Sequence, residues 1–204
     1  MGQIGRRMSV AQLAQPIEAA AQLALRVQAC RSIHLPIDQQ IRRLKYPHKP
    51  FKRWVEMQQL ATAGMGLEEL YPALEPFQRP FIMAPAHGDF TPWHLIVSGE
   101  RLVLVDAEHA SSFHPIFYDV ATFYHWTYIC TGSMSVVSSF LSAVKSGLRA
   151  RDKKVFEEYF LACLAFRILV GFAMTHEPGT RQMEFIVRHR RMKKWFLLGE
   201  LPGM

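Results

Sequence analysis

The chain has 204 residues, of which 50% are hydrophobic and 20% are charged. This composition is typical of a globular protein and excludes an intrinsically disordered one. The formal net charge is +7, but no zinc-finger spacing or aromatic-interleaved basic motif accompanies it, so nucleic acid is not expected as a partner. Three cysteines in no metal-binding pattern predict small core residues and a reducing, cytoplasmic environment.

Residues 1–80 predict a helical linker and the first helices of a lobe, and 81–204 predict a small hairpin followed by a helical remainder. The elements of the first part are, in chain order, a helix over 9–33, a polar surface connection over 36–50, a helix over 51–63 and a short helix over 67–74. Ser9 is a suitable cap for the first helix, and Gly64 is a suitable stop after the second. We expect the two parts to form one structural domain.

The second part begins with strand signals. Apolar residues lie on both sides of a Ser-Gly turn in 95–105, which indicates two short strands joined as a hairpin. A strand over 81–84 precedes the hairpin, and a loop to about Pro115 follows it. The later elements are helices over 118–129, 135–148, 152–175 and 180–198. The expected fold class is α+β and mainly helical. The apolar stretch 159–175 contains Arg167 and is short for a membrane span, so it predicts a buried helix.

Polar residues bracket the predicted hairpin. His94 lies directly before its first strand and Asp106 directly after its second strand, while Asp89 precedes both in His-Gly-Asp. Because a hairpin returns the chain to its starting point and neighbouring strands lie about 5 Å apart, these three side chains are expected at one end of the hairpin. Two acids and a third ligand held on loops are typical of phosphoryl transfer, in which acids orient a hydroxyl and bind magnesium.

At this point the sequence resembles a known family. The stretch HGDFTPWHLIV (87–97) is similar to the catalytic loop of the aminoglycoside phosphotransferase and choline kinase family, within the protein-kinase-like fold. VDAE (105–108) is similar to its metal-binding motif, and FYDVA (117–121) resembles its following F-D-L-A turn. The resemblance implies the C-terminal lobe of a cytoplasmic kinase. Its cofactors would be Mg²⁺ and ATP or GTP, and its acceptor would be a hydroxyl of a small molecule or glycan.

The resemblance also implies residue roles. Asp89 would be the catalytic base for the acceptor hydroxyl, and Asp106 would hold magnesium bridging the phosphates. His87 and Asp119 would support the catalytic loop through hydrogen bonds. Glu108 would either contact the waters of a second metal ion or brace the loop.

His94 departs from the family, which has a metal-ligating Asn at this point. Imidazole is a poor ligand for magnesium, so the change predicts a weaker metal site, a preference for manganese or a single-metal enzyme. A packed, hydrogen-bonded histidine without a metal role is the plainer alternative. Kinases of lipopolysaccharide core sugars resemble the chain in carrying a histidine here, which makes such a kinase an alternative function.

A second departure concerns residues 1–80, which contain no glycine-rich strand-turn-strand segment and no phosphate-binding lysine strand. The sequence therefore predicts a C-terminal lobe whose N-terminal nucleotide lobe is missing, supplied by another chain, or lost. The partner would then be a chain that carries this lobe, or a second copy in a homodimer. A catalytically inactive kinase-like lobe acting as a binding or scaffold module is the competing interpretation.

The basic segment 188–194 predicts a solvated face of the last helix, with peripheral contact to an anionic membrane surface as the alternative. Its charge favours an anionic or neutral glycan over a polycationic aminoglycoside as acceptor. Trp93, Phe113 and Trp126 lie near the motifs and are predicted as core residues rather than as a substrate-stacking surface.

Overall fold

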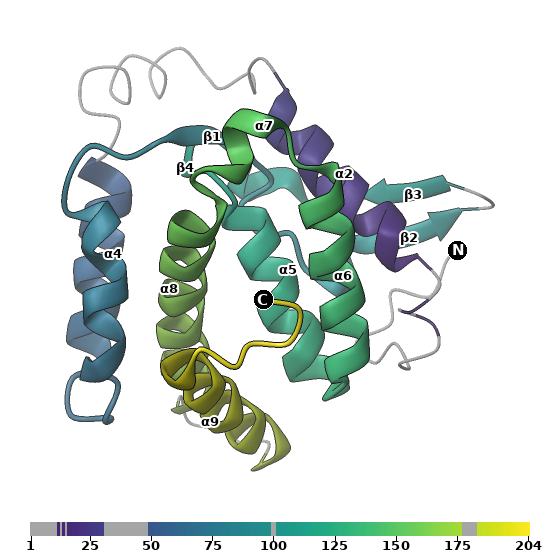
Figure 1. Ribbon diagram of the computed structural model, residues 1–204. Helices are drawn as coiled ribbons and strands as arrows, with labels where there is room; N and C mark the ends of the chain where they lie inside the picture. The colour runs from purple at the N-terminus through teal and green to yellow at the C-terminus, as the bar shows by residue number, and fades with distance from the viewer. Residues whose placement is uncertain (1–11, 13, 15, 31–48, 99–100, 177–182) are drawn as a thin grey trace.

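Helix α5, Tyr118–Thr131, lies at the centre of the fold, with α8 on one side and α6 on the other (Figure 1). The computed structural model describes residues 12, 14, 16–30, 49–98, 101–176 and 183–204. Every residue from 118 to 129 is buried, because aromatic and apolar side chains occur on all faces of this helix. α5 ends at Gly132, whose left-handed backbone closes the last turn.

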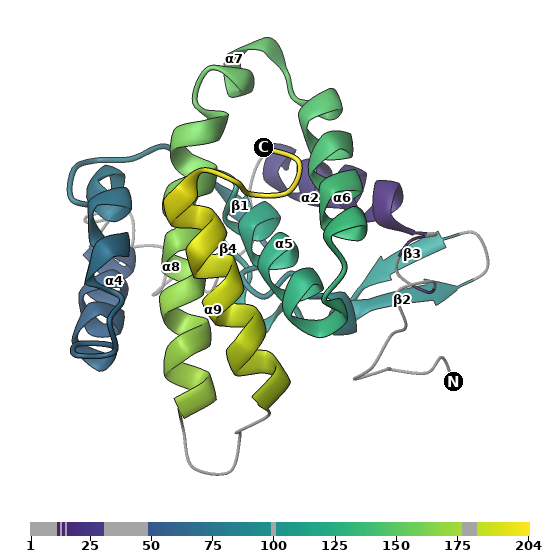
Figure 2. The same ribbon diagram turned by 60° about the horizontal axis from the view of Figure 1, so that its bottom comes forward.

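Helices α2 (Ile17–Ala29), α6 (Met134–Gly147), α8 (Phe156–His176) and α9 (Met183–Leu198) pack against α5, whereas α4 (Lys49–Ala61) and α7 (Ala150–Lys153) pack against α8. The 3₁₀ helix η1 (Glu68–Phe77) also packs against α8, as does α9, which runs beside α8 in Figure 2. The mainly helical α+β architecture expected from the sequence is confirmed.

Two antiparallel pairs of strands complete the fold. The predicted hairpin is confirmed as β2 (Leu95–Ser98) and β3 (Arg101–Leu104), with Leu95 opposite Leu104. The hairpin projects from the helical body (Figure 1). β1 (Met83–Ala86) pairs with β4 (Ser111–Pro115), and a bulge interrupts the pairing between Ala84 and Ala86.

The prediction of a loop to about Pro115 is therefore wrong. β4 lacks apolar alternation, and its strand conformation comes from pairing with β1. In this pairing Met83 of β1 lies opposite Pro115 of β4. The first strand is also displaced, since β1 begins at Met83 rather than at Phe81.

Several helix bounds also differ from the predictions. The short helix predicted over 67–74 is a 3₁₀ helix, which tolerates the two prolines within it better than an α-helix does. The helix predicted over 152–175 is divided into α7 and α8, because Arg149 binds the buried Asp152 carboxylate (Nε to Oδ2, 2.7 Å) and fixes α7 as a separate turn. Within the predicted helix over 9–33, α2 covers Ile17–Ala29 and residues 12 and 14 are also helical, while Ser9 lies outside the described residues. Residues 36–48 of the predicted connection over 36–50 also lie outside them, and its last two residues belong to α4.

Helix α8 is the one described helix that is long and apolar enough to cross a membrane, over Phe156–Thr175. However, 78% of its most apolar window is buried within the fold, as the sequence predicted for 159–175. Cys163 on this helix is a buried core residue as expected, whereas Cys30 is exposed and corrects the expectation that all three cysteines are in the core.

Candidate active site

The 87–91 loop connects β1 to the 3₁₀ helix η2 (Pro92–His94) and positions Asp89. Gly88 has a left-handed backbone (φ 84°), and a Cβ atom at this position would lie 2.3 Å from the carbonyl oxygen of His109. A side chain is therefore excluded by both the backbone conformation and the close approach of the 3₁₀ helix η3 (Ala107–His109). On the other side of Asp89, Phe90 is fully buried against Phe123 (ring centroids 5.4 Å apart). The loop is thus fixed on both sides of Asp89.

Asp119, in the first turn of α5, binds the 87–91 loop from behind. Its two carboxylate oxygens accept hydrogen bonds from the backbone N–H groups of His87 (2.6 Å) and Gly88 (3.0 Å). Burial raises the pKa of Asp119 to about 7, although the two backbone donors partly offset this shift. The His87 ring faces the carbonyl oxygen of Val105 (Nε2 to O, 3.0 Å), and burial lowers its pKa. A neutral His87 therefore donates to the residue before Asp106 and joins the two motifs.

His94 lies between the two acids. Its Nδ1 is 2.9 Å from the Asp89 carbonyl oxygen and 3.5 Å from the Asp89 carboxylate, and its Nε2 is 3.3 Å from Oδ2 of Asp106. A carbonyl oxygen can only accept, so Nδ1 carries a hydrogen and donates it to Asp89. In a neutral imidazole Nε2 would then present a lone pair to the Asp106 carboxylate. The two atoms are close enough to share a proton or a cation.

Asp106 follows β3 in a left-handed conformation (φ 66°) that is uncommon for residues other than glycine. Its side chain is 53% exposed, so one of its carboxylate oxygens can contact His94 while the group stays open to solvent. Glu108 lies in the adjoining η3, where its carboxylate is exposed and 3.3 Å from Nε2 of His109. Glu108 does not contact His94 or Asp106 through any interaction among the described residues.

Asp106 and His94 provide one carboxylate and one imidazole nitrogen to a divalent cation. No group of three or more metal-ligating side chains converges within the described residues. Magnesium in nucleotide sites, however, is commonly held by one or two carboxylates together with phosphates and water. The exposed Asp106 carboxylate meets that need, and Nε2 of His94 adds a nitrogen ligand that suits manganese better. The residues present therefore fit a cation that is bound together with a polyphosphate.

A cavity of about 500 Å³ opens beside Asp89 and Glu108. We call it the aromatic cavity, because its walls include Phe51, Trp54, Trp93, Phe113, His114 and Trp126. Trp126 is buried, as predicted, but Trp93 and Phe113 are only partly buried and face this space, which corrects their assignment to the core. A volume of this size accommodates a small organic molecule or a sugar ring.

Arg167 of α8 also lines the aromatic cavity and was not assigned to the site from the sequence. Arg167, Val170 and Met174 are spaced three and four residues apart, so one face of α8 forms this wall. The available signal in the sequence is an arginine inside an otherwise apolar helix, which by itself indicates only that the helix does not span a membrane.

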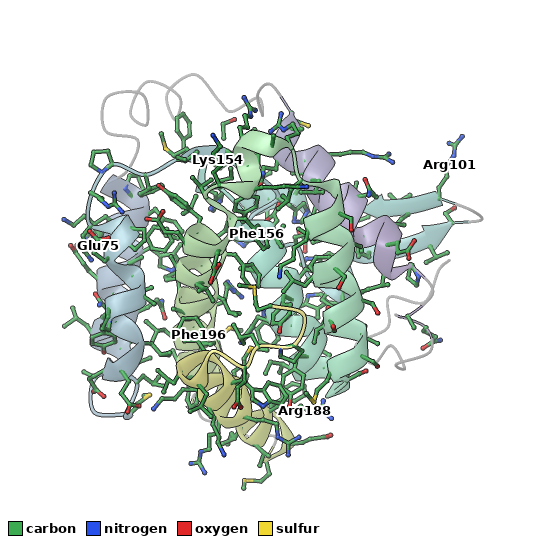
Figure 3. The ribbon with its side chains drawn as sticks, in the orientation of Figure 1. Glu75, Arg101, Lys154, Phe156, Arg188 and Phe196 are labelled. Carbon is green, nitrogen blue, oxygen red and sulfur yellow. The ribbon has the colours of Figure 1, made fainter. Side chains whose placement is uncertain are left out.

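Two other regions lie apart from these residues. A larger cavity of about 830 Å³ is lined by Glu75, Phe156 and Phe196, which Figure 3 labels, and by none of the predicted site residues. In the basic segment 188–194, Arg188 binds the carbonyl oxygen of Ile129 (2.6 Å) and Lys193 binds Glu69 (2.6 Å). These two cations therefore stabilise the fold, and contact of the segment with a membrane stays a prediction.

No known family model matches the chain, and no curated protein matches it. The resemblance to phosphotransferases thus depends on the motif residues and on the geometry that they adopt.

Proposed function

We propose that the chain is a phosphotransferase of the aminoglycoside phosphotransferase-like kind, forming the C-terminal lobe of a protein-kinase-like fold. It would transfer the γ-phosphate of ATP or GTP to a hydroxyl of a small molecule or glycan bound in the aromatic cavity. One observation carries the proposal: the Asp89 carboxylate lines this cavity and also contacts His94, whose other nitrogen reaches Asp106. The acceptor side and the phosphate side of the reaction therefore meet at His94.

In this mechanism Asp89 accepts the proton of the acceptor hydroxyl as the hydroxyl oxygen attacks the γ-phosphorus atom. The bond from that phosphorus to the bridging oxygen breaks, and the nucleoside diphosphate leaves. The backbone N–H bonds to Asp119 and the close approach of His109 to Gly88 hold the base in place, so little reorganisation is needed during the reaction. Asp106 and His94 would hold the magnesium ion, which neutralises charge on the phosphates, and Glu108 stands near the mouth of the cavity. The aromatic walls exclude water from the acceptor.

The Asp89→Asn substitution tests the assignment of the base. It keeps the shape of the side chain but removes the proton acceptor, so phosphoryl transfer should fall by a factor of about 10² or more. Because the Asp89 side chain is 31% exposed, the free energy of unfolding should change by less than about 1 kcal/mol. Glu157→Gln, in the larger cavity, is the matched control and should keep full activity. Equal activity of Asp89→Asn and the control would reject the role of Asp89.

A non-catalytic scaffold module is the second candidate. The hairpin exposes Val97 and Val103 (58% and 42% exposed), which lie beside the site where a nucleotide-binding lobe or a partner chain would cover them. A scaffold predicts self-association of the isolated chain and binding of a hydrophobic dye. A monomer in sedimentation that binds no dye would count against it.

A kinase of lipopolysaccharide core sugars is an enzymatic alternative, favoured by the exposed Arg190, Arg191 and Lys194 on α9. These cations would attract an anionic glycolipid. Lack of affinity for such a glycolipid at physiological salt would remove this alternative.

A further inference from the structure

Arg167 is a buried cation that forms no ion pair with any residue that the structure describes. The residue is 5% exposed, and its one hydrogen bond among the described residues runs from Nη1 to the hydroxyl of Tyr118 (3.3 Å). Its Nε is buried without a hydrogen-bond partner in that part of the chain. Lys145 and Lys153 of the larger cavity, and Arg149 and Arg151 of a third cavity beside Asp152, are all less buried than Arg167.

A buried guanidinium requires compensation, because removing a charge from water costs several kcal/mol unless an anion accompanies it. The Tyr118 hydroxyl is neutral, since burial raises its pKa to about 12. The buried carboxyl of Asp119 interacts electrostatically with Arg167, but both of its oxygens already accept backbone N–H groups and it forms no ion pair with the guanidinium. Compensation from within the described structure is therefore incomplete.

The location of Arg167 indicates where the missing anion comes from. Arg167 lines the aromatic cavity, as does the carboxylate of Asp89. Three tryptophans and two phenylalanines line the same space and have flat apolar surfaces. A molecule in this cavity can thus place a ring against the aromatic walls, an anionic group at the guanidinium and a hydroxyl at Asp89. The guanidinium fork matches a carboxylate, and it also binds phosphate well.

We propose that Arg167 forms an anion subsite in the aromatic cavity and that the acceptor is a hydroxyl compound bearing a carboxylate or phosphate group. The position of the hydroxyl rests on the proposed function, whereas the anion subsite does not depend on it. A cationic aminoglycoside or amino alcohol is excluded as acceptor, because its charge would meet a buried arginine. The net positive charge of the chain favours the same class of acceptor, but Arg167 adds a defined site for it.

The test is a binding measurement without nucleotide or metal. Tryptophan fluorescence reports the binding, since Trp54, Trp93 and Trp126 line the cavity. Four probes of matched shape are compared, namely 4-(hydroxymethyl)benzoate, 4-(hydroxymethyl)phenylphosphonate, the neutral 4-(hydroxymethyl)benzamide and the cationic 4-(hydroxymethyl)benzamidine. We expect the carboxylate or the phosphonate to bind at least about tenfold more tightly than the amide, as charge-assisted bonds to arginine allow. The benzamidine should bind most weakly. The preferred anion then identifies which group the natural acceptor carries.

Variants locate the effect. Arg167→Met should remove the preference for the anion while leaving binding of the amide unchanged. Arg101→Gln, which removes a cation at the outer end of the hairpin (Figure 3), should leave all four affinities unchanged. If Arg167→Met does not fold, Arg167→Lys serves instead, and we expect it to weaken carboxylate binding because it lacks the planar fork.

Equal binding of the carboxylate, phosphonate and amide, or preferred binding of the benzamidine, would overturn the anion subsite. So would an anion preference that survives unchanged in the Arg167 variants. These outcomes are independent of phosphoryl transfer, because no nucleotide is present. The activity of Asp89→Asn tests the proposed function, and the anion preference tests the subsite. Either proposal can therefore be rejected without the other.

Discussion

The contact between Gly88 and His109 can be tested by adding one methyl group. In Gly88→Ala the new Cβ would lie 2.3 Å from the His109 carbonyl oxygen and 2.9 Å from its Cβ atom. Backbone atoms cannot rotate away as the end of a side chain can, so η3 must move. A non-glycine residue in the left-handed region costs about 1–2 kcal/mol, and overpacking adds about 1–3 kcal/mol. The free energy of unfolding should therefore fall by about 2–5 kcal/mol.

Gly64→Ala provides a matched control. Gly64 has a similar left-handed backbone (φ 76°), but a Cβ atom there would meet nothing within 4 Å. The free energy of unfolding of this variant should fall only by the cost of the left-handed backbone, about 1–2 kcal/mol. The difference between the two alanine variants, about 1–3 kcal/mol, isolates the approach of η3 to the 87–91 loop.

Equilibrium unfolding in urea measures both values, provided that the slope of the transition is the same in the variants. Phosphoryl transfer should fall in Gly88→Ala and stay unchanged in Gly64→Ala, because η3 carries Glu108 and directly follows Asp106. If the two variants lose equal stability, η3 does not approach the loop as described, and the geometry proposed for the site is wrong.

Two further predictions concern Asp119 and His94. The raised pKa of Asp119, about 7 against 3.8 in the unfolded chain, means that the folded state binds this proton more tightly, so its contribution to stability is complete below about pH 4 and is lost as pH rises to 7. Relative to Asp119→Asn, the wild type should lose roughly 1 kcal/mol per pH unit between pH 4.5 and 6.5 in urea unfolding, and parallel pH profiles would contradict this. His94→Asn replaces a nitrogen ligand beside Asp106 by an amide oxygen, so the ratio of magnesium- to manganese-supported activity should rise. An unchanged or lower ratio would mean that His94 does not contact the metal.

The hairpin and the order of the polar motifs were predictable from the sequence. Apolar residues on both sides of a glycine turn specify the register of β2 and β3, and this register alone brings His94 and Asp106 together. The position of Asp119 behind the 87–91 loop followed from the resemblance, since 31 and 32 residues of chain separate it from the two groups that it binds, and no local rule connects them.

The strand β4, the aromatic cavity and the surroundings of Arg167 depend on tertiary contacts and were not predictable from local sequence. β4 contains two serines and a proline and is a strand only because β1 pairs with it. The aromatic cavity brings together residues of α4, α5, α8 and the segments around η2 and β4, so no single stretch of sequence shows it. The periodicity of α8 predicts a buried helix. It does not determine whether Arg167 lines a cavity or pairs with an acidic residue.

Calorimetric titration of magnesium-ATP into the chain, with Asp106→Ala as the comparison, tests the central claim most directly. The Asp106 side chain is 53% exposed, so its removal should leave the fold intact while removing the carboxylate that would hold the metal. We predict measurable binding by the wild type that depends on magnesium and is lost in Asp106→Ala. Binding that is equal in both proteins would contradict a metal–nucleotide site at Asp106, and absence of binding by the wild type would contradict nucleotide use by this chain on its own.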